Sequence, residues 1–264
     1  MNIIRRISLL ALVMVGSASA FGADLKCATP GSVEEFNYSW RLRGGVRFLA
    51  GFLFPTSGLG NLKTTYGDTV HSELLITAPN GKAGGFYAYE SDMDTNGAKT
   101  LMTYHGYSWG KKARNERTVF DYVKGLARIR KETPEEVENR VRKLPDADQF
   151  RDILTAIHFL RTNAGAITKP IQTSIFSDGK EYPVVFRPAE RKSFTIDGKA
   201  TQAVGFDIVD APGGRKWPGG VKVYLTNDTR RIPVRIEITQ SLAALQLDLK
   251  KVDACKTQIA QAGL

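Results

Sequence analysis

The chain has 264 residues and a formal net charge of +10, and 42% of its residues are hydrophobic. This length lies well above the marginal size range and provides a sizeable core in one large or two small domains. After the first twenty residues no apolar run is long enough to cross a bilayer, which excludes a helical membrane-spanning protein.

The first twenty residues, MNIIRRISLLALVMVGSASA, have the three parts of a secretory signal peptide. Arg5 and Arg6 provide the basic start, Ile7 to Val15 the apolar run, and Ala18 and Ala20 the A-x-A cleavage pattern. An uncleaved anchor is the alternative, but a membrane span needs about 20 apolar residues. We expect cleavage after residue 20 and export of a soluble protein to a bacterial periplasm.

Cleavage removes two arginines and lowers the net charge from +10 to +8. In an exported protein this charge favours anionic partners of the cell envelope, such as lipid head groups or acidic polysaccharide, over nucleic acid. A basic surface that is merely solvated is the alternative.

The two cysteines, Cys27 and Cys255, lie near the two ends of the mature chain. In an oxidising compartment the simplest interpretation is one disulfide that joins the termini. The alternative is two separate reactive thiols.

The first half of the mature chain contains short segments of alternating polarity separated by turn residues, which favours an antiparallel meander over alternating βαβ units. The predicted strands are Glu35 to Arg43, Thr69 to Thr77, Gly85 to Ser91, Thr100 to Tyr107, Thr118 to Val123 and Leu126 to Glu132. The charged run from Lys111 to Arg117 is expected to separate two of them.

The segment from Gly44 to Asn61 combines five glycines with a cluster of phenylalanines. Frequent glycine weakens both helix and strand, which indicates a bulged strand or a loop. Phe48, Phe52 and Phe54 then either fill the core from a kinked strand or form an apolar lip beside a ligand cavity.

The hydrophobic period changes to that of a helix after residue 132. Thr133-Pro134-Glu135-Glu136 has the residues of a helix start, with a capping threonine, a proline at the first position and acids in the first turn. A second helix is predicted from Asp146, because apolar residues then recur at three- and four-residue steps up to Leu160. We expect this helix to end at Asn163-Ala164-Gly165 and to lie across the concave face of the sheet.

Strands return after the helix, at Lys169 to Phe176, Glu181 to Pro188, Lys192 to Ile196 and Ala200 to Val209. Asp178-Gly179 and Asp197-Gly198 are signals of tight hairpins. Gly220 to Leu249 adds three alternating strands. No internal repeat or linker interrupts the chain, so residues 21–264 are predicted to form a single β-rich domain with its core at about 35–250.

Three segments together resemble a family of exported bacterial proteins, the domain of unknown function 3108. They are the helix from Asp152 to Thr162, the Asp178 to Tyr182 hairpin, and Val223 to Asp228 followed by Arg231 to Arg235. The resemblance runs from about Tyr38 to Leu249. It implies an antiparallel, strongly curved sheet or open barrel around one helix, similar to periplasmic lipoprotein carriers, and it implies no activity.

One segment fits a catalytic motif. Gly106-Tyr107-Ser108-Trp109-Gly110 matches the G-x-S-x-G pattern, in which a strand-turn-helix exposes a nucleophilic serine over an α/β sheet. The residues that follow are too charged for the buried helix of that motif, and the surrounding chain is predicted to be antiparallel. We interpret Ser108 as part of a turn and expect a protein without enzymatic activity, with a hydrolase as the alternative.

The chain also lacks a strong metal motif. His71, His105 and His158 are isolated, without the spacing of zinc ligands. Asp92 and Asp94 resemble the start of a calcium loop, but the later acidic ligand and the flanking helices of an EF-hand are missing. We therefore predict no metal and no cofactor.

Export, a concave sheet and aromatic residues together favour a protein that binds or carries an apolar, lipid-like ligand in a barrel cavity. The candidate ligand-binding residues are Phe48, Phe52, Phe54, Ile157, Arg231 and Arg235, the arginines being placed to meet an anionic head group. The alternative is a non-catalytic envelope scaffold that is filled by its own side chains and docks a protein or an anionic polysaccharide.

Overall fold

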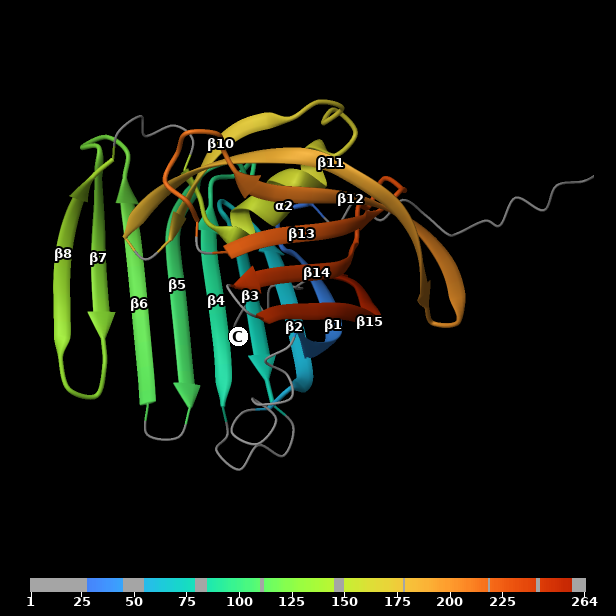
Figure 1. Cartoon of the computed structure of the whole chain (residues 1–264), viewed down its shortest axis with the longest axis horizontal. Helices are drawn as coiled ribbons and strands as arrows, with labels where there is room; N and C mark the ends of the chain where they lie inside the picture. Colours follow the sequence, from blue (N-terminus) through green and yellow to red (C-terminus); the bar gives the residue numbers. More distant parts are fainter. Residues whose placement is uncertain are drawn as a thin grey trace, which may run out of the picture.

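The computed structural model describes residues 28–44, 55–78, 85–109, 112–144, 150–177, 179–217, 219–240 and 243–257. Fifteen strands of these residues form one sheet, with a helix on its concave side (Figure 1). The strands are β1 (Ser32–Arg43), β2 (Ser57–Tyr66), β3 (Val70–Thr77), β4 (Phe86–Met93), β5 (Thr100–Trp109), β6 (Lys112–Asp121), β7 (Leu126–Glu132), β8 (Val137–Lys143), β9 (Phe150–Arg151), β10 (Ile171–Ser177), β11 (Lys180–Ile196), β12 (Lys199–Asp210), β13 (Gly219–Thr226), β14 (Pro233–Gln240) and β15 (Ala243–Thr257), and the helix is α2 (Ile153–Asn163).

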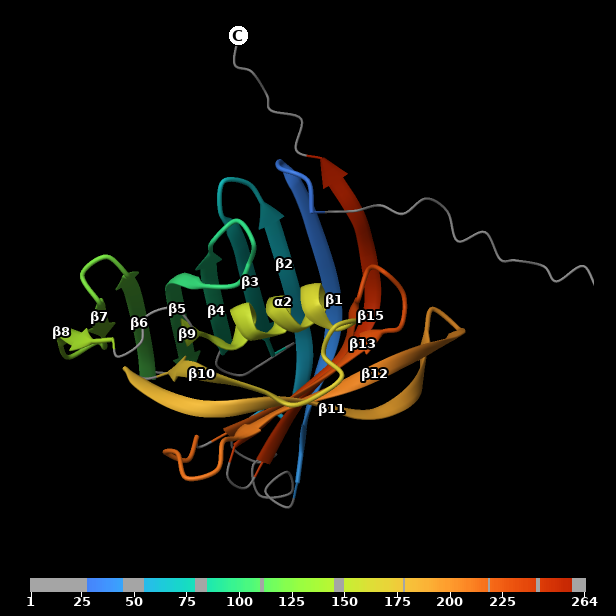
Figure 2. The same cartoon turned by 90° about the horizontal axis from the view of Figure 1, so that it is seen from above.

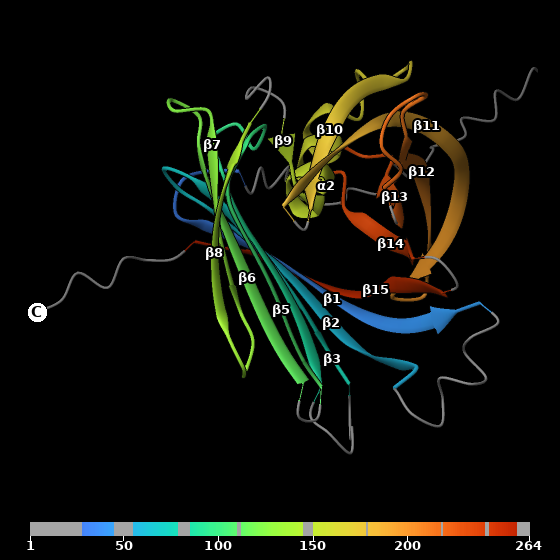
Figure 3. The ribbon, with the colours of Figure 1, turned by 60° about the vertical axis from the view of Figure 1, so that its left-hand side comes forward.

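The strand order makes the sheet an open barrel. It runs from β8 back to β1, continues with β15 and then runs back to β9. Every pair is antiparallel except β9 and β10, which are parallel. The two halves of the sheet curl toward each other with α2 between them (Figures 2 and 3). The predicted fold class, a strongly curved antiparallel sheet with one helical segment across its concave face, is confirmed.

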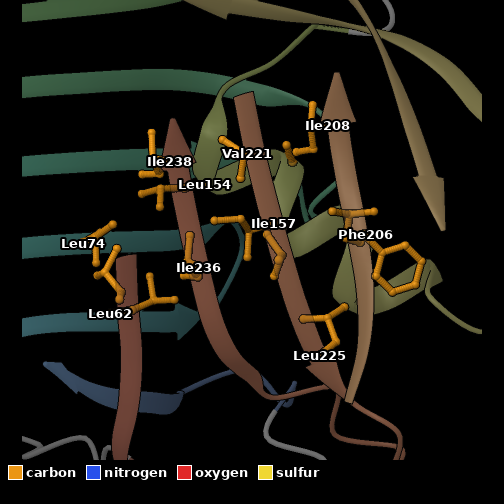
Figure 4. Close-up of a cluster of buried hydrophobic side chains, with 14 of the residues drawn as sticks. Leu62, Leu74, Leu154, Ile157, Phe206, Ile208, Val221, Leu225, Ile236 and Ile238 are labelled. Carbon is orange, nitrogen blue, oxygen red and sulfur yellow. The ribbon is translucent and has the colours of Figure 1, made fainter. Parts of the chain in front are cut away.

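The core lies between the concave face and α2. Alternation at period two turns Val234, Ile236 and Ile238 of β14 inward, while Arg235 and Glu237 face outward. Helix residues three apart, Leu154 and Ile157, pack into the same cluster as side chains of β2, β3 and β12–β14 (Figure 4). The helix therefore fills the interior of the barrel at this level.

A second, smaller cluster lies beside the opening between β8 and β9. Phe176 of β10 makes edge-on contacts with Phe120 of β6 and Phe150 of β9, at centroid distances of 5.0 and 6.0 Å. Ile129 of β7 and Leu144 belong to the same cluster. Apolar packing thus joins the two ends of the sheet where backbone hydrogen bonds do not.

The hairpin predicted at Asp197-Gly198 is confirmed. Both residues have a positive φ, 48° and 74°, as a tight turn between β11 and β12 requires. The two strands predicted before it form one long strand, β11, whose register shifts between Pro188 and Arg191.

The helix predicted from Thr133 is wrong, because this residue forms the turn of the β7–β8 hairpin. The amide of Thr133 donates to the carbonyl of Glu136 at 2.9 Å, and the amide of Glu136 donates to the Thr133 hydroxyl at 3.2 Å. Capping residues also favour turns, and here pairing with β7 decides the outcome. Likewise, the helix predicted from Asp146 begins only at Ile153.

The strand predictions also missed the second half of β2, residues 62–66, and the first half of β6, whereas the first half of β2 corresponds to the bulged-strand alternative for the glycine-rich segment. Ser57 to Asn61, assigned with the glycine-rich segment, belongs to β2, and the charged residues from Lys112 to Arg117 belong to β6. In β6, Lys112, Arg114 and Glu116 share one face, and Asn115 and Arg117 lie on the other, so the start of the strand has no apolar face. Among the described residues, no helix is long and apolar enough to cross a membrane.

Gly58 in β2 lets a side chain cross the strand. The indole Nε1–H of Trp40 in β1 reaches over Gly58 and donates to the carbonyl of Thr77 in β3 at 2.8 Å. A Cβ at Gly58 would lie 2.1 Å from that carbonyl oxygen and 2.4 Å from the indole nitrogen. Only glycine leaves room at this position for the Trp40 indole to reach the Thr77 carbonyl.

We predict that Gly58→Ala lowers the free energy of unfolding by about 2 kcal/mol or more, because it displaces the hydrogen bond of a buried tryptophan. Gly60→Ala is the matched control, since its nearest contact is a flexible Leu247 methyl at 3.1 Å. Urea unfolding followed by circular dichroism measures both. Equal losses in the two variants would contradict the explanation.

Candidate functional site

Helix α2 divides the concave face into a covered and an open part. The helix packs against β3, β4 and β9, and Figure 2 shows it lying across the strands. The strands β5 to β8 extend beyond it (Figure 3). How the helix is held, and what the open part presents, define the candidate site.

The N-terminal end of α2 is fixed by hydroxyl groups of the sheet. The carboxylate of Asp152 caps the helix by accepting from the Thr155 amide at 2.7 Å. The Thr155 hydroxyl hydrogen-bonds with Ser91 of β4 at 2.9 Å and with Thr100 of β5 at 2.8 Å. The Asp152 amide in turn donates to the Thr100 hydroxyl at 3.0 Å. Small polar residues on the concave face thus satisfy a buried helix end.

The C-terminal end is fixed by an ion pair inside the barrel. The Arg161 guanidinium donates to both carboxylate oxygens of Glu34 in β1, at 2.9 and 3.1 Å. Tyr66 of β2 donates its hydroxyl to the same carboxylate at 2.7 Å. Arg161 also donates to the carbonyls of Arg231 at 3.1 Å and Arg230 at 3.4 Å, in the loop between β13 and β14. One side chain therefore connects the helix to both halves of the sheet.

The buried groups at this end of the helix have shifted pKa values. For Glu34, burial and pairing act in opposite directions. Burial works to raise the pKa of Glu34, but the Arg161 guanidinium and the Tyr66 hydroxyl outweigh it and hold that pKa below its usual value. Burial lowers the pKa of the neighbouring His158 to about 4, with a further contribution from the charge of Arg161. At neutral pH the cluster holds one paired cation, one anion and a neutral imidazole.

The open part of the concave face begins with a strip of aromatic rings. Tyr87 of β4 and Tyr107 of β5 occupy paired positions and stack at 6.0 Å. One row further along the strands, Tyr89 and His105 pair in the same way and stack at 4.5 Å. Tyr87 is 45% exposed. We call these four residues the aromatic strip.

The strip continues into charged rows on β6 to β8. Strand pairing places Glu116, Lys131 and Glu138 in line with His105, and Arg114 in line with Tyr107. Arg114 and Glu116 form an ion pair at 2.5 Å. The open part of the concave face thus changes from aromatic to charged over a few strands.

A hollow lies between the aromatic strip and the first turn of α2. Tyr89, His105 and Glu116 line it from the sheet, and Asp152, Leu154 and Phe176 line it from the helix and β10. Its volume is about 50 Å³, which is room for one or two water molecules and far below the 300–1,000 Å³ of typical ligand pockets. The hollow beside the first turn of α2 is therefore too small for a ligand, and Leu154 and Ile157 pack into the core cluster next to it.

The structure places the predicted ligand-binding residues apart from one another. Ile157 is 2% exposed and belongs to the core. Arg231 lies in the β13–β14 loop, where its guanidinium donates to the carbonyl of Thr226 at 3.3 Å. Arg235 faces outward from β14 and pairs with Asp248 at 2.6 Å. These three residues do not form one surface.

Phe48, Phe52 and Phe54 lie outside the described residues, as does Cys27. The apolar lip and the Cys27–Cys255 disulfide therefore stay predictions. The aromatic strip was missed at the level of the sequence, although its tyrosines are visible in the alternating segments 85–91 and 100–107. Which tyrosines share a face becomes clear only from the register of β4 with β5.

The segment that matched G-x-S-x-G does not form the required strand-turn-helix. Ser108 lies within β5, paired with Phe86 of β4 and Ala113 of β6. Asp94, which resembles part of a calcium loop in the sequence, accepts hydrogen bonds from the amides of Ala98 and Lys99. Within the described part of the chain, no group of three His, Cys, Asp or Glu residues is placed to hold a metal ion.

We predict that Arg161→Met lowers the free energy of unfolding by about 3–5 kcal/mol, because it leaves the Glu34 carboxylate buried without its cation. The double variant Glu34→Gln/Arg161→Met should recover part of this loss. Arg187→Met is the control. The Arg187 side chain is exposed and pairs with Asp207, and exposed ion pairs contribute about 0–1 kcal/mol. Urea unfolding at pH 7 gives the three values, and a loss in Arg161→Met no larger than the control would refute this role.

We also predict that His158 makes the protein less stable in mild acid. Its folded pKa of about 4 lies below the ordinary histidine pKa of 6.5, so the unfolded chain binds the proton more readily. Stability is complete above pH 6.5 and falls by about 3 kcal/mol as the pH drops toward 4. His158→Gln should flatten this part of the profile, and unchanged slopes between pH 4 and 6.5 would contradict the assignment.

The chain has counterparts among known families and structures. The family model described as "Protein of unknown function (DUF3108)" matches residues 62–250. The crystal structure of a beta-barrel-like protein of domain of unknown function DUF1849 from Brucella abortus is similar in fold, with a TM-score of 0.55 and 13% identity over 85% of this chain and 98% of that chain. No curated protein matches the chain. The fold places this chain with beta-barrel-like proteins, and the match over most of its length shows that it belongs to the DUF3108 family.

Proposed function

We propose that the protein is an exported, non-catalytic binding protein of the bacterial periplasm that holds a lipid-like amphiphile on the open part of its concave face. The observation that carries this proposal is the outer end of the aromatic strip, the stacked pair Tyr87 and Tyr107, which lies outside the hollow at the first turn of α2 and leads into charged rows. Export is supported by the signal-like first twenty residues.

The chemistry of this surface suits a molecule with an apolar and a charged end. Tyrosine rings offer large apolar faces with a polar tip, which is why they are frequent at surfaces that are partly wet. Arg114 and Lys131 of the charged rows, with Arg140 two residues beyond Glu138 on the same face of β8, supply cations for an anionic head group, and Glu116 and Glu138 lie between them. The ligand would lie along the strip with its head group toward β6 to β8.

The ligand is placed beside the helix because the interior under α2 is filled. An acyl chain could enter the core only if α2 moved, which would break the contacts of Arg161 with Glu34 and with the β13–β14 loop. A buried ion pair separated in this way leaves two uncompensated charges. The open face needs no such rearrangement.

We predict that Tyr107→Ala weakens binding of a fluorescent phospholipid analogue about tenfold, because a stacked ring and its apolar area are lost. Tyr104→Ala is the matched control: this tyrosine lies on the same strand but on the opposite face, where its hydroxyl donates to Asn115 at 3.0 Å. Fluorescence titration measures both affinities. Equal weakening in the two variants would contradict binding at the aromatic strip.

The ligand itself is to be sought in protein purified from cells of the source bacterium. Native mass spectrometry should show a lipid-sized adduct that disappears on solvent extraction. A protein that is always empty and takes up no fluorescent lipid would overturn the proposal.

A second candidate function is an envelope scaffold that docks a protein or an anionic polysaccharide. The observation in its favour is the filled interior, with its hollow of about 50 Å³. Retention on an immobilised acidic polysaccharide, without any lipid binding, would favour this role. In both functions Ser108 is expected to be inert toward a fluorophosphonate probe, and labelling of Ser108 would instead indicate a hydrolase.

A further inference from the structure

Strand β8 is an open edge of the sheet. It is the last strand in the order, and β7 is its one pairing partner among the described residues. In Figure 1 it lies at the left-hand end of the sheet. Val137 and Val141 are 55% and 61% exposed, although they are apolar. Such an edge offers unpaired backbone groups to another strand.

The backbone groups that point outward can be identified from the β7–β8 ladder. The amide of Thr133 donates to Glu136, and the amide of Leu144 donates to Gly125, so the hydrogen-bonded pairs alternate from these two ends. Glu138, Arg140 and Arg142 therefore direct their amides and carbonyls toward β7. Those of Val137, Asn139 and Val141 point away from the sheet.

The side chains of this strand have a two-fold pattern centred on Asn139. Residues 135 to 143 read E-E-V-E-N-R-V-R-K. Reversing this segment exchanges every glutamate with a cation and each valine with the other valine. An antiparallel second copy in this register would place Glu138 opposite Arg140, Glu136 opposite Arg142 and Val137 opposite Val141.

We propose that β8 pairs with β8 of a second copy of this chain, antiparallel and in register at Asn139, to form a symmetric dimer with a continuous sheet. Such an interface is isologous, since the same edge is used by both copies. Opposite charges at directly facing positions stabilise a strand pair, and like charges destabilise it. The outward-pointing groups of Val137, Asn139 and Val141 are the ones that form hydrogen bonds in this register.

Charged residues on an edge strand also serve to prevent pairing, so the distribution of the charges is the decisive observation. A protective edge works with any arrangement of charge and needs no symmetry. Glu136, Glu138, Arg140 and Arg142 are arranged so that the edge is complementary to a second copy of itself. The other edge, β9, has two residues and a buried Phe150, and cannot accept a long strand.

Two charge-reversed variants of the full chain test the proposal. One carries Arg140→Glu and Arg142→Glu, and the other carries Glu136→Lys and Glu138→Lys. Each variant alone faces like charges at all four central positions, so we expect its dimerisation constant to weaken about tenfold to hundredfold. Mixed in equal amounts, the two variants are complementary again, and sedimentation should show a heterodimer with wild-type affinity.

A cysteine pair tests the register. In the proposed dimer the two copies of residue 139 face each other at a Cα separation of about 5.5 Å, within the range that a disulfide spans. Asn139→Cys should therefore form a disulfide between the two copies under mild oxidation. In the same register residue 137 faces residue 141 of the other copy, so Val137→Cys should form no more crosslinked dimer than the wild-type protein. Circular dichroism confirms that each variant is folded.

A wild-type protein that stays monomeric at about 200 µM, a concentration well above the dissociation constant of a micromolar dimer, would overturn the proposal. A dimer that is unaffected by either charge reversal would also overturn it, because another surface would then hold the copies together. Equal crosslinking at positions 137 and 139 would exclude the register centred on Asn139.

Discussion

The ion pair between Arg161 and Glu34 is the contact on which the interior of this protein depends. It joins α2 to β1, and the same guanidinium binds the carbonyls of the β13–β14 loop. Two charges inside an apolar barrel are tolerated because each is satisfied by several hydrogen bonds. With the helix held in this way, its apolar face packs into the core of the barrel.

This ion pair also connects two of the segments on which the family resemblance was based in the sequence. The helix from Asp152 to Thr162 and the segment from Thr226 to Arg235 are far apart in the sequence, yet Arg161 connects them. In the second segment the Asp228 carboxylate accepts the amides of Arg230 and Arg231 and so shapes the loop that receives the arginine. These two segments therefore form one structural joint inside the barrel.

Alternation and turn residues were sufficient to predict most strands, the β11–β12 hairpin and the helix across the concave face. They failed at Thr133, where capping residues serve a turn as well as a helix, and at Lys112 to Arg117, where both faces of the strand are solvated. The candidate site was beyond sequence reasoning for a different reason. The aromatic strip exists because Tyr87 pairs with Tyr107 and Tyr89 with His105, and register between strands follows from the assembled sheet.

The open face and the β8 edge are parts of one surface. Side chains alternate along β8, so Glu138 and Arg140 continue the charged rows of the concave face while Val137 and Val141 lie on the other side. The two-fold axis of this dimer runs perpendicular to the sheet, midway between the two copies of Asn139. The concave faces of both copies therefore lie on the same side of the joined sheet. Pairing of the two edges would join two charged borders into one central band, with an aromatic strip on either side. A surface of that symmetry can hold two amphiphiles with their head groups together, which links the proposed dimer to the proposed ligand.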